Sequence, residues 1–343
     1  MKKLLVIAYE FPPIRASNDR MFHFCRFLPR FGWKPVVVAP RRPSAWLPAF
    51  DPRFSVPAEM EVYDAPAMRH LEFLAKNLFL RVYLNSIFFL LSSYNVGQRI
   101  LREQGEDIRL IYATVPTSAC LIAAYRLSQK FHKPFVLDFR DPHYPSWLYK
   151  KEFLNSLQHA RQIITTTAVY KNELIGQGAP SERITVIPNG TDLSTVTRLQ
   201  KEENLPRSSA FTVIYAGGYF KIYRVETLVR TLALRFKDRD IRFVVVGEPE
   251  PGQERMIAFA KEQGLKVEFK GRLSEQDTLR ELLKATVAYN GSSHPGGLGG
   301  KMYDYLACGL PVLGYNPKGS STCVFIEKYN VGLTTDREEE LVK

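Results

Sequence analysis

Asn290-Gly-Ser-Ser-His-Pro-Gly-Gly-Leu-Gly-Gly-Lys-Met-Tyr-Asp-Tyr-Leu-Ala-Cys-Gly-Leu-Pro-Val-Leu-Gly-Tyr315 is the stretch around which this chain is organised. It follows an apolar, strand-like run at 285–289 and places four glycines within five positions, at 296, 297, 299 and 300. A helical pattern comes next, with Met302, Tyr305 and Leu306 on one side. Glycines let backbone N–H groups approach an anion, and the start of a helix adds positive potential. The pattern predicts a phosphate site, although an ordinary glycine-rich loop before a core helix would look the same.

Particular residues of this stretch suit a nucleotide. Lys301 adds a full positive charge in the first helical turn, and the loop residues Gly297, Leu298 and Gly299 would surround the phosphates. Asp304 comes one turn later, where a carboxylate can accept hydrogen bonds from ribose hydroxyls.

Length and composition indicate a globular protein with two domains. The chain has 343 residues, of which 45% are apolar and 24% charged. The four cysteines show no spacing typical of a metal site, so we expect reduced, buried thiols in a cytosolic protein. The apolar run at residues 4–9 is too short for a secretory signal and is predicted to be a buried first strand.

The net charge of +12 is concentrated in the first half. Residues 1–190 hold 25 Lys and Arg against 15 Asp and Glu, and the remainder is nearly balanced. The excess suits an anionic partner, such as a phosphate-bearing acceptor or an acidic membrane surface, or forms only a solvated basic face. Nucleic acid is the weakest candidate, because no RNA-binding motif accompanies the charge.

Strand-like runs alternate with helical patterns in the first half, which predicts a parallel sheet covered by helices. The runs lie at residues 3–8, 35–39, 108–113, 135–138, 162–165 and 184–187, and a helix is expected at 19–30. The loop that leaves the first strand carries Arg15, Ser17 and Asn18 at the edge of the sheet where ligands bind. A proline-rich surface excursion at 40–70 precedes an apolar stretch at 71–94, predicted to be a pair of core helices or, alternatively, an interfacial membrane helix.

Asp138, Arg140 and Asp141 leave another strand at the same edge. They could act in catalysis. Alternatively, they could form a salt-bridged turn in which Asp138 pairs with Arg140 or Asp141 caps the next helix.

The second half repeats the alternation after a polar run at 198–209 that resembles a linker. We therefore expect domains at 1–200 and 201–343. Gly217 and Gly218 form a tight turn after the strand at 211–216, and Gly247 ends the next strand. The glycine pattern is not that of a redox dinucleotide site.

Several motifs in this order resemble the retaining glycosyltransferases of family 4. They are the Phe-Pro-Pro of residues 11–13, Asp138-Phe-Arg-Asp-Pro, Val186-Ile-Pro-Asn-Gly-Thr-Asp, Tyr215-Ala-Gly-Gly, Phe269-Lys-Gly-Arg and Lys301-Met-Tyr-Asp-Tyr-Leu-Ala-Cys-Gly-Leu-Pro. The resemblance spans nearly the whole chain. It implies an α/β protein of the GT-B fold, with two Rossmann-like domains facing across a cleft, the first for the acceptor and the second for a nucleotide-sugar donor.

The resemblance also implies roles for single residues. Asp304 matches the second acid of the family's glutamate pair, whereas Gly296 stands at the first, with His294 as the nearest polar substitute. Lys221 and Lys301 are the expected cations for the leaving diphosphate, with Arg224 as an alternative to Lys221. Arg272 would frame the base, and Arg140 or Asp141 would contact the sugar or acceptor. No metal ion or cofactor is expected, because the resemblance implies a metal-independent GT-B enzyme.

The expected function is transfer of a hexose or N-acetylhexosamine, with retention of configuration, from a nucleotide diphosphate to a saccharide acceptor. The acceptor would be lipid-linked, in cell-surface polysaccharide or lipopolysaccharide synthesis, and the protein would be cytoplasmic, at the inner face of the membrane. A sugar-nucleotide epimerase and a non-catalytic membrane-associated partner remain alternatives. The helix that closes the family's fold is expected to be missing after residue 343.

Overall fold

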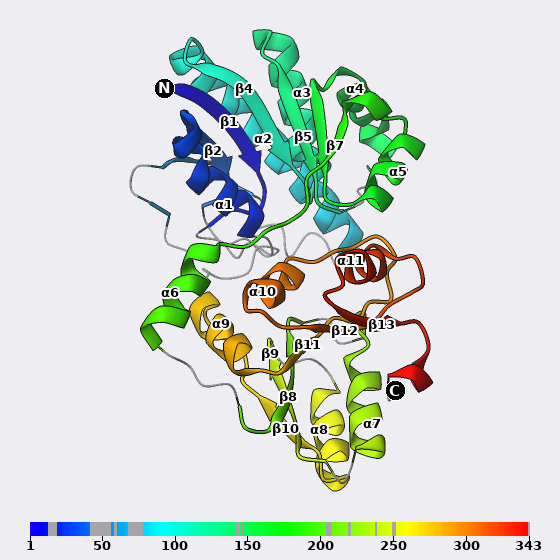
Figure 1. The fold of residues 1–343 in the computed structure, drawn as a ribbon. Helices are drawn as coiled ribbons and strands as arrows, with labels where there is room; N and C mark the ends of the chain where they lie inside the picture. Colours follow the sequence, from blue (N-terminus) through cyan, green and yellow to red (C-terminus); the bar gives the residue numbers. More distant parts are fainter. Residues whose placement is uncertain are drawn as a thin grey trace. The chain divides into compact units, whose positions relative to one another are not determined.

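The computed structural model describes residues 1–12, 19–41, 56–57, 60–67, 78–141, 145, 147–203, 208–218, 221–236, 239–248 and 252–341. The chain divides into two compact units, Met1–Pro188 and Asn189–Lys343. Each unit is built on its own parallel sheet with helices on both faces (Figure 1). This confirms the predicted pair of Rossmann-like α/β domains.

The sheet of the first unit has the strand order β3-β2-β1-β4-β5-β6-β7, and every neighbouring pair is parallel. Its strands are β1 (Lys2–Ala8), β2 (Trp33–Ala39), β3 (Glu61–Asp64), β4 (Ile108–Thr114), β5 (Phe135–Phe139), β6 (Gln162–Thr165) and β7 (Ile184–Val186). Six of them were predicted. The strand β3 was not predicted, because this four-residue edge strand lies in the proline-rich excursion and is only partly buried.

Helices cover both faces of this sheet. They are α1 (Asp19–Phe27), η1 (Leu28–Phe31), α2 (Leu78–Gln104), α3 (Ser118–Phe131), η2 (Trp147–Tyr149), α4 (Lys150–His159), α5 (Ala168–Gly176) and η3 (Ser181–Arg183). The even-numbered residues of β1, such as Leu4 and Val6, lie on one face of the sheet and pack with α1. The odd-numbered residues Leu5 and Ile7 lie on the other face and pack with α2, α3 and α4. This division follows from the two-residue period of a strand.

The apolar stretch at 71–94 belongs to one long helix over its described part. α2 runs without interruption to Gln104, so the predicted helix pair is wrong for residues 78–94. Phe89 and Leu90 are buried in the core, as the core interpretation requires, whereas Phe88 and Leu91 are exposed. Among the described residues, no helix is both long enough and apolar enough to cross a membrane.

The sheet of the second unit has the order β10-β9-β8-β11-β12-β13, again entirely parallel. Its strands are β8 (Phe211–Ala216), β9 (Ile241–Val246), β10 (Lys266–Phe269), β11 (Val287–Tyr289), β12 (Val312–Tyr315) and β13 (Gly332–Thr335). The strand order reverses between β8 and β11, just as it does between β1 and β4 in the first unit. In open parallel sheets, ligands bind beyond the carboxyl ends of the strands at such a switch point.

Two helical layers enclose this second sheet. The helices are α6 (Leu193–Glu203), α7 (Val225–Arg235), α8 (Gln253–Glu262), α9 (Glu275–Lys284), α10 (Lys301–Ala307), α11 (Ser321–Tyr329) and η4 (Glu338–Glu340). α7 and α8 pack on one face, and α6, α9, α10 and α11 pack on the other. All four cysteines of the chain are free and buried, as predicted.

The predicted linker at 198–209 is wrong for its first part, because residues 198–203 belong to α6. Val196 and Leu199 of this helix are buried in the core of the second unit. The units divide after Pro188, so the boundary expected near residue 200 falls inside α6. A helix with only two buried side chains and a polar outer face is easily taken for a linker.

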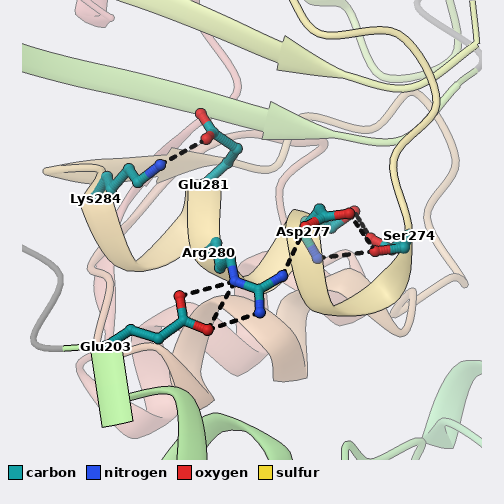
Figure 2. A network of polar contacts seen from close by, with 7 residues as sticks. Glu203, Ser274, Asp277, Arg280, Glu281 and Lys284 are labelled. Atoms are coloured by element: carbon teal, nitrogen blue, oxygen red, sulfur yellow. Dashed lines mark hydrogen bonds and ion pairs between the residues drawn. The ribbon is translucent and has the colours of Figure 1, made fainter. Parts of the chain in front are cut away.

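A polar network joins α6 to α9. Figure 2 shows the Arg280 guanidinium between Glu203 of α6 and Asp277 of its own helix. Its Nε and Nη2 lie 2.8 Å and 2.6 Å from the Glu203 carboxylate, and its Nη1 lies 2.7 Å from Asp277. Ser274, the N-cap of α9, donates to Asp277 at 2.6 Å. The network adds a polar connection to the apolar packing of α6.

Replacing Arg280 with Met should lower the thermal stability slightly at pH 7 and by a smaller amount near pH 3. The pKa of Glu203 is lowered by its Arg280 hydrogen bond, and that of Asp277 by Ser274 and then Arg280. A carboxylate whose pKa is lower in the folded protein than in the unfolded chain stabilises the fold fully above its pKa in the unfolded chain. This stabilisation is lost as the pH falls below about 4, through the pKa of the folded protein. Thermal unfolding at both pH values is the measurement. Arg230→Met, which removes a single exposed pair on α7, is the control; an undiminished difference at pH 3 contradicts the prediction.

Candidate functional site

Two glycine turns meet at the switch point of the second sheet. Gly217 and Gly218 follow β8, and Asn290 and Gly291 follow β11. A Cβ on Gly291 would lie 2.2 Å from the Tyr289 hydroxyl, so no side chain fits there. The Nδ2 of buried Asn290 has no hydrogen-bond partner among the described residues. A buried donor without a partner is costly, and a ligand or water at the switch point would satisfy it.

Gly247 allows the ends of β8 and β9 to approach closely. A Cβ on Gly247 would lie 2.1 Å from the carbonyl oxygen of Gly217. The N–H of Gly217 donates to Val246 at 2.8 Å, and the N–H of Gly247 donates to Gly271 at 2.9 Å. Both predicted glycines are therefore structural parts of this edge, and their role toward a ligand stays a prediction.

Lys301 reaches this glycine turn from the first position of α10. Its Nζ lies 3.1 Å from the centre of the Tyr223 ring, 4.4 Å from that of Tyr215 and 3.3 Å from the Tyr215 hydroxyl. A Cβ on Gly217 would lie 3.5 Å from the same nitrogen. The structure thus brings together Lys301 and Gly217, which lie far apart in the sequence.

The surroundings of the Lys301 amine favour an anionic ligand. Burial lowers the pKa of Lys301 well below its ordinary value. The two tyrosine rings attract the ammonium form, which opposes part of this effect. A phosphate next to the amine would favour the charged form further. Binding of an anion would therefore offset the cost of burying the Lys301 ammonium group.

The loop before α10 is held by hydrogen bonds to other parts of the second unit. The Asn189 side chain donates to the Leu298 carbonyl at 3.2 Å, and the Thr322 hydroxyl donates to the Gly297 carbonyl at 3.0 Å. Leu298 itself is buried in the core, and the N–H of Met302 donates to Gly299 at 3.2 Å. These contacts restrain the loop, as a preorganised site requires.

His294 folds back onto its own loop. Its Nδ1 accepts a hydrogen bond from the N–H of Gly296 at 3.1 Å, so in the neutral ring the proton is on Nε2. The side chain remains exposed. The His294 ring therefore lies next to Gly296, the position where the sequence lacks an acid, and its role as a substitute for that acid stays a prediction.

Asp304 faces a partly buried, polar environment one turn after Lys301. Burial raises the pKa of Asp304 to about 6, a hydrogen bond from Thr191 opposes the rise, and the charge of Glu275 adds to it. The carboxylate is therefore mostly ionised at neutral pH and is able to accept further hydrogen bonds.

The other residues predicted in this unit lie at the same edge but point to different partners. Lys221 is exposed in the turn before α7, and Arg224 places its guanidinium 4.3 Å from the centre of the Tyr315 ring. Arg272 is exposed and donates to Glu248 at 2.8 Å, joining the loops that follow β9 and β10. The side chains that the structure places beside Gly217 are those of Tyr215 and Lys301. No observation assigns Lys221 or Arg272 to a ligand.

Arg140 connects three strand ends at the switch point of the first sheet. Its Nη2 donates to Glu10, after β1, and to the Val115 carbonyl, after β4, each at 3.1 Å. The Thr166 hydroxyl, after β6, donates to the Arg140 carbonyl at 2.9 Å. Arg140 lies at the predicted ligand edge, with its charge neutralised by Glu10.

The alternative of an Asp138–Arg140 pair is wrong. Asp138 is fully buried on β5, and Arg20 of α1 pairs with it at 3.4 Å. Arg140 pairs instead with Glu10 at 3.1 Å, so each of the two residues has a partner on another segment. Asp141 is exposed. Arg15, Ser17 and Asn18, predicted to contact the acceptor, lie outside the described residues.

A basic cavity lies at the opposite, amino edge of the first sheet. It has a volume of about 810 Å³, and its lining includes Trp33, Arg109, Arg161 and Arg183. The Arg183 guanidinium donates hydrogen bonds to the carbonyl oxygens of Gln158 and Ala160. Part of the positive charge of the first half therefore lies away from the switch point.

Four residues that shape the ligand edges of the two sheets were not predicted as site residues, namely Glu10, Thr191, Tyr215 and Tyr223. Tyr215 and Glu10 stand at or just after the ends of predicted strands, which was a usable signal. Tyr223 and Thr191 gave no such signal, because their contacts with Lys301 and Asp304 join segments distant in sequence.

Two family profiles of glycosyltransferases match this chain, one over each half. The sequence profile described as Glycosyltransferase Family 4 matches residues 19–195, and the profile described as Glycosyl transferases group 1 matches residues 196–343. No curated protein matches the chain in sequence.

Solved structures share the fold at low sequence identity. HepE of Anabaena in complex with UDP is 18% identical, with a TM-score of 0.67, and sucrose-phosphate synthase of Thermosynechococcus elongatus is 17% identical, with a TM-score of 0.71. Each comparison covers 100% of this chain and 88% of the other. WaaG, a glycosyltransferase involved in lipopolysaccharide biosynthesis, is 14% identical over 99% of this chain and 88% of its own, with a TM-score of 0.63. These likenesses confirm the GT-B fold.

Proposed function

The chain belongs to the family-4 glycosyltransferases of the GT-B fold, and from this premise we propose that its second unit binds a nucleotide diphosphate sugar for retaining transfer to a saccharide. One observation carries the proposal: the Lys301 amine lies beside Gly217 at the switch point, with Asp304 one helical turn away. A cation near a glycine turn suits a diphosphate, and a carboxylate nearby suits a ribose. HepE, of the same fold, has been solved with UDP and with UDP-glucose.

The chemistry that the site would perform is stabilisation of the leaving group. When the bond from the anomeric carbon to the diphosphate breaks, negative charge develops on the departing oxygen. The Lys301 ammonium and the amides of Gly218 and Gly297–Gly299 are the groups that we propose for this charge. In this proposal Lys301, with Lys221 as a second cation, stabilises the negative charge of the diphosphate in place of a metal ion.

The first unit would bind the acceptor. Arg140 and Glu10 form a rigid ion pair at its ligand edge, and Asp141 is exposed beside them. We propose that Arg140 positions the acceptor or the transferred sugar, while Asp141 is available to accept a hydrogen bond from a sugar hydroxyl.

The acceptor that we propose is a lipid-linked saccharide of cell-surface polysaccharide or lipopolysaccharide synthesis. The net charge of +10 in residues 1–190 favours a phosphate-bearing lipid, and WaaG takes part in lipopolysaccharide biosynthesis. Action on such an acceptor would place the protein in the cytoplasm, at the inner face of the membrane.

A nucleotide screen tests the donor assignment. Uridine, guanosine, adenosine and thymidine diphosphates are added separately, and thermal unfolding is followed. A ligand present at about 100 times its Kd stabilises the native state by about 2.7 kcal/mol, so one base should raise the melting temperature clearly above the others. No shift with any diphosphate contradicts donor binding.

Incubation with the sugar nucleotide of the preferred base then separates the alternatives. Transfer to a lipid-linked saccharide, with the donor's anomeric configuration kept in the product, supports a retaining glycosyltransferase. An epimerised sugar formed from donor alone indicates an epimerase instead. Association with liposomes without turnover indicates the non-catalytic partner. Addition of a chelator tests whether transfer needs a metal ion.

A further inference from the structure

The basic cavity at the amino edge of the first sheet lies at the opposite end of the strands from Arg140. Phe135, the first residue of β5, lines the cavity, and Arg140 directly follows the last residue of the same strand. At a rise of about 3.3 Å per residue, Phe135 and Arg140 are about 17 Å apart. The cavity is therefore separate from the edge where the acceptor is proposed to bind.

Two arginines of the cavity carry charges that the protein itself does not neutralise. Arg109 is at the start of β4, and Arg161 directly precedes β6. Among the residues that the structure describes, neither guanidinium has a hydrogen-bond or ion-pair partner, and the described lining holds no Asp or Glu. Other cations along this edge are paired, since Glu61 lies 3.7 Å from Lys3 and 2.7 Å from Lys34.

Hydrogen bonds hold the walls of the cavity in place. The Gln162 amide donates to the Arg183 carbonyl at 2.7 Å and to the Thr185 hydroxyl at 2.8 Å, which joins β6 to β7. The Ser128 hydroxyl donates to the Lys133 carbonyl at 2.6 Å, which fixes the turn between α3 and β5. A ligand would therefore meet a largely preformed surface, as small-molecule sites usually offer.

The size and the apolar part of the lining suit an organic molecule better than a bare ion. Trp33, Leu110 and Val136 supply apolar surface beside the arginines. The volume of about 810 Å³ is in the range of pockets that bind small organic molecules. Only β5 separates β4 from β6, so Arg109 and Arg161 start from strands about 10 Å apart and can reach one ligand of this size.

We propose that this cavity binds a phosphate ester, with its phosphate on Arg109 and Arg161 and its organic part against Trp33. Guanidinium groups form paired hydrogen bonds to phosphate oxygens, and they do so best where no carboxylate competes. A phosphate ester is presented either by a soluble organic phosphate or by the headgroup of an anionic phospholipid. The two sources share this chemistry, and experiment separates them.

Calorimetric titration with inorganic phosphate and with glycerol 3-phosphate tests the soluble source. The double variant Arg109→Gln/Arg161→Gln should bind at least tenfold more weakly than wild type, because it lacks the hydrogen bonds to the charged group. Both arginines are exposed, so the variant should unfold at the wild-type temperature. Lys301→Met should bind both compounds as wild type does, which separates this cavity from the candidate donor site.

Sedimentation with vesicles tests the membrane source. Wild type should sediment with phosphatidylglycerol vesicles but not with phosphatidylcholine vesicles, and Arg109→Gln/Arg161→Gln should lose at least tenfold in affinity. Lys150→Gln/Lys151→Gln is the matched control in both experiments. It removes the same charge from exposed positions at the start of α4, whereas the cavity is lined by His159 at the end of this helix.

Each outcome decides the proposal. A loss of soluble phosphate binding in the arginine variant alone assigns the cavity to a soluble organic phosphate, and a loss confined to phosphatidylglycerol vesicles assigns it to a phospholipid headgroup. A wild-type protein that binds none of these probes overturns the proposal. So does an arginine variant that binds as wild type, or a loss that the Lys150→Gln/Lys151→Gln control shares.

Discussion

Lys301→Met is expected to weaken nucleotide diphosphate binding by about 10- to 100-fold without lowering the stability of the fold. A hydrogen bond to a charged group contributes about 1.5–3 kcal/mol, which corresponds to this range. Lys301 is the cation that the structure places beside Gly217, between the rings of Tyr215 and Tyr223. Methionine fills a similar volume there but offers no charge to a phosphate.

The same variant should unfold at an equal or higher temperature than wild type at pH 7. Burial lowers the pKa of Lys301, so the unfolded chain binds a proton there more readily than the folded protein. Wild-type stability from this residue therefore rises with pH up to the ordinary lysine value of about 10.4, and the advantage of the variant shrinks over that interval. Calorimetric titration and thermal unfolding at pH 7 and 9.5 are the measurements.

Lys328→Met is the matched control for both effects. Lys328 is also on a helix of the second unit and lies 5.0 Å from the centre of the Tyr329 ring, but it is exposed. It should change neither binding nor the pH dependence. Wild-type affinity in Lys301→Met would exclude Lys301 from the phosphate site.

Gly247→Ala is expected to destabilise the second unit by about 3 kcal/mol or more and to abolish nucleotide binding. The new Cβ would lie 2.1 Å from the Gly217 carbonyl oxygen and 2.8 Å from its carbon. Both clashing atoms are backbone, so no flexible side chain can move aside. Relief requires separating the ends of β8 and β9, which carries Gly217 away from Lys301.

Denaturant unfolding followed by two probes localises this effect. All three tryptophans, at 33, 46 and 147, belong to the first unit, so their fluorescence reports on that unit, whereas circular dichroism reports on both. The variant should lose part of its circular dichroism at low denaturant, before the fluorescence changes. Gly300→Ala is the control, since Gly300 has helical backbone angles and open space around its Cα, and it should stay within about 0.5 kcal/mol of wild type. Equal unfolding of the two variants would show that the edge tolerates a Cβ.

Much of the architecture could be predicted because its causes are local. A buried parallel strand is a short apolar run, and a surface helix repeats its apolar residues with a period near 3.6, so both are visible in consecutive residues. The strands at 162–165 and 211–216 were predicted with the bounds that the structure gives. Prediction failed for β3 and for the start of α6, where few side chains are buried and the local pattern is weak.

The features of the candidate site also fall into two groups, those that local sequence predicts and those that it does not. The sequence by itself determined the glycine turns, Lys301 and Asp304, because the spacing of glycines and of residues along one helix fixes what those segments can present. Only the tertiary structure decided the partners: Tyr223 and Gly217 for Lys301, Thr191 for Asp304, and Glu10 for Arg140. These contacts depend on the strand order, which reverses at β8 and β11 and at β1 and β4. The order in which strands assemble into a sheet reflects packing of the whole chain, and for that reason no single segment encodes it.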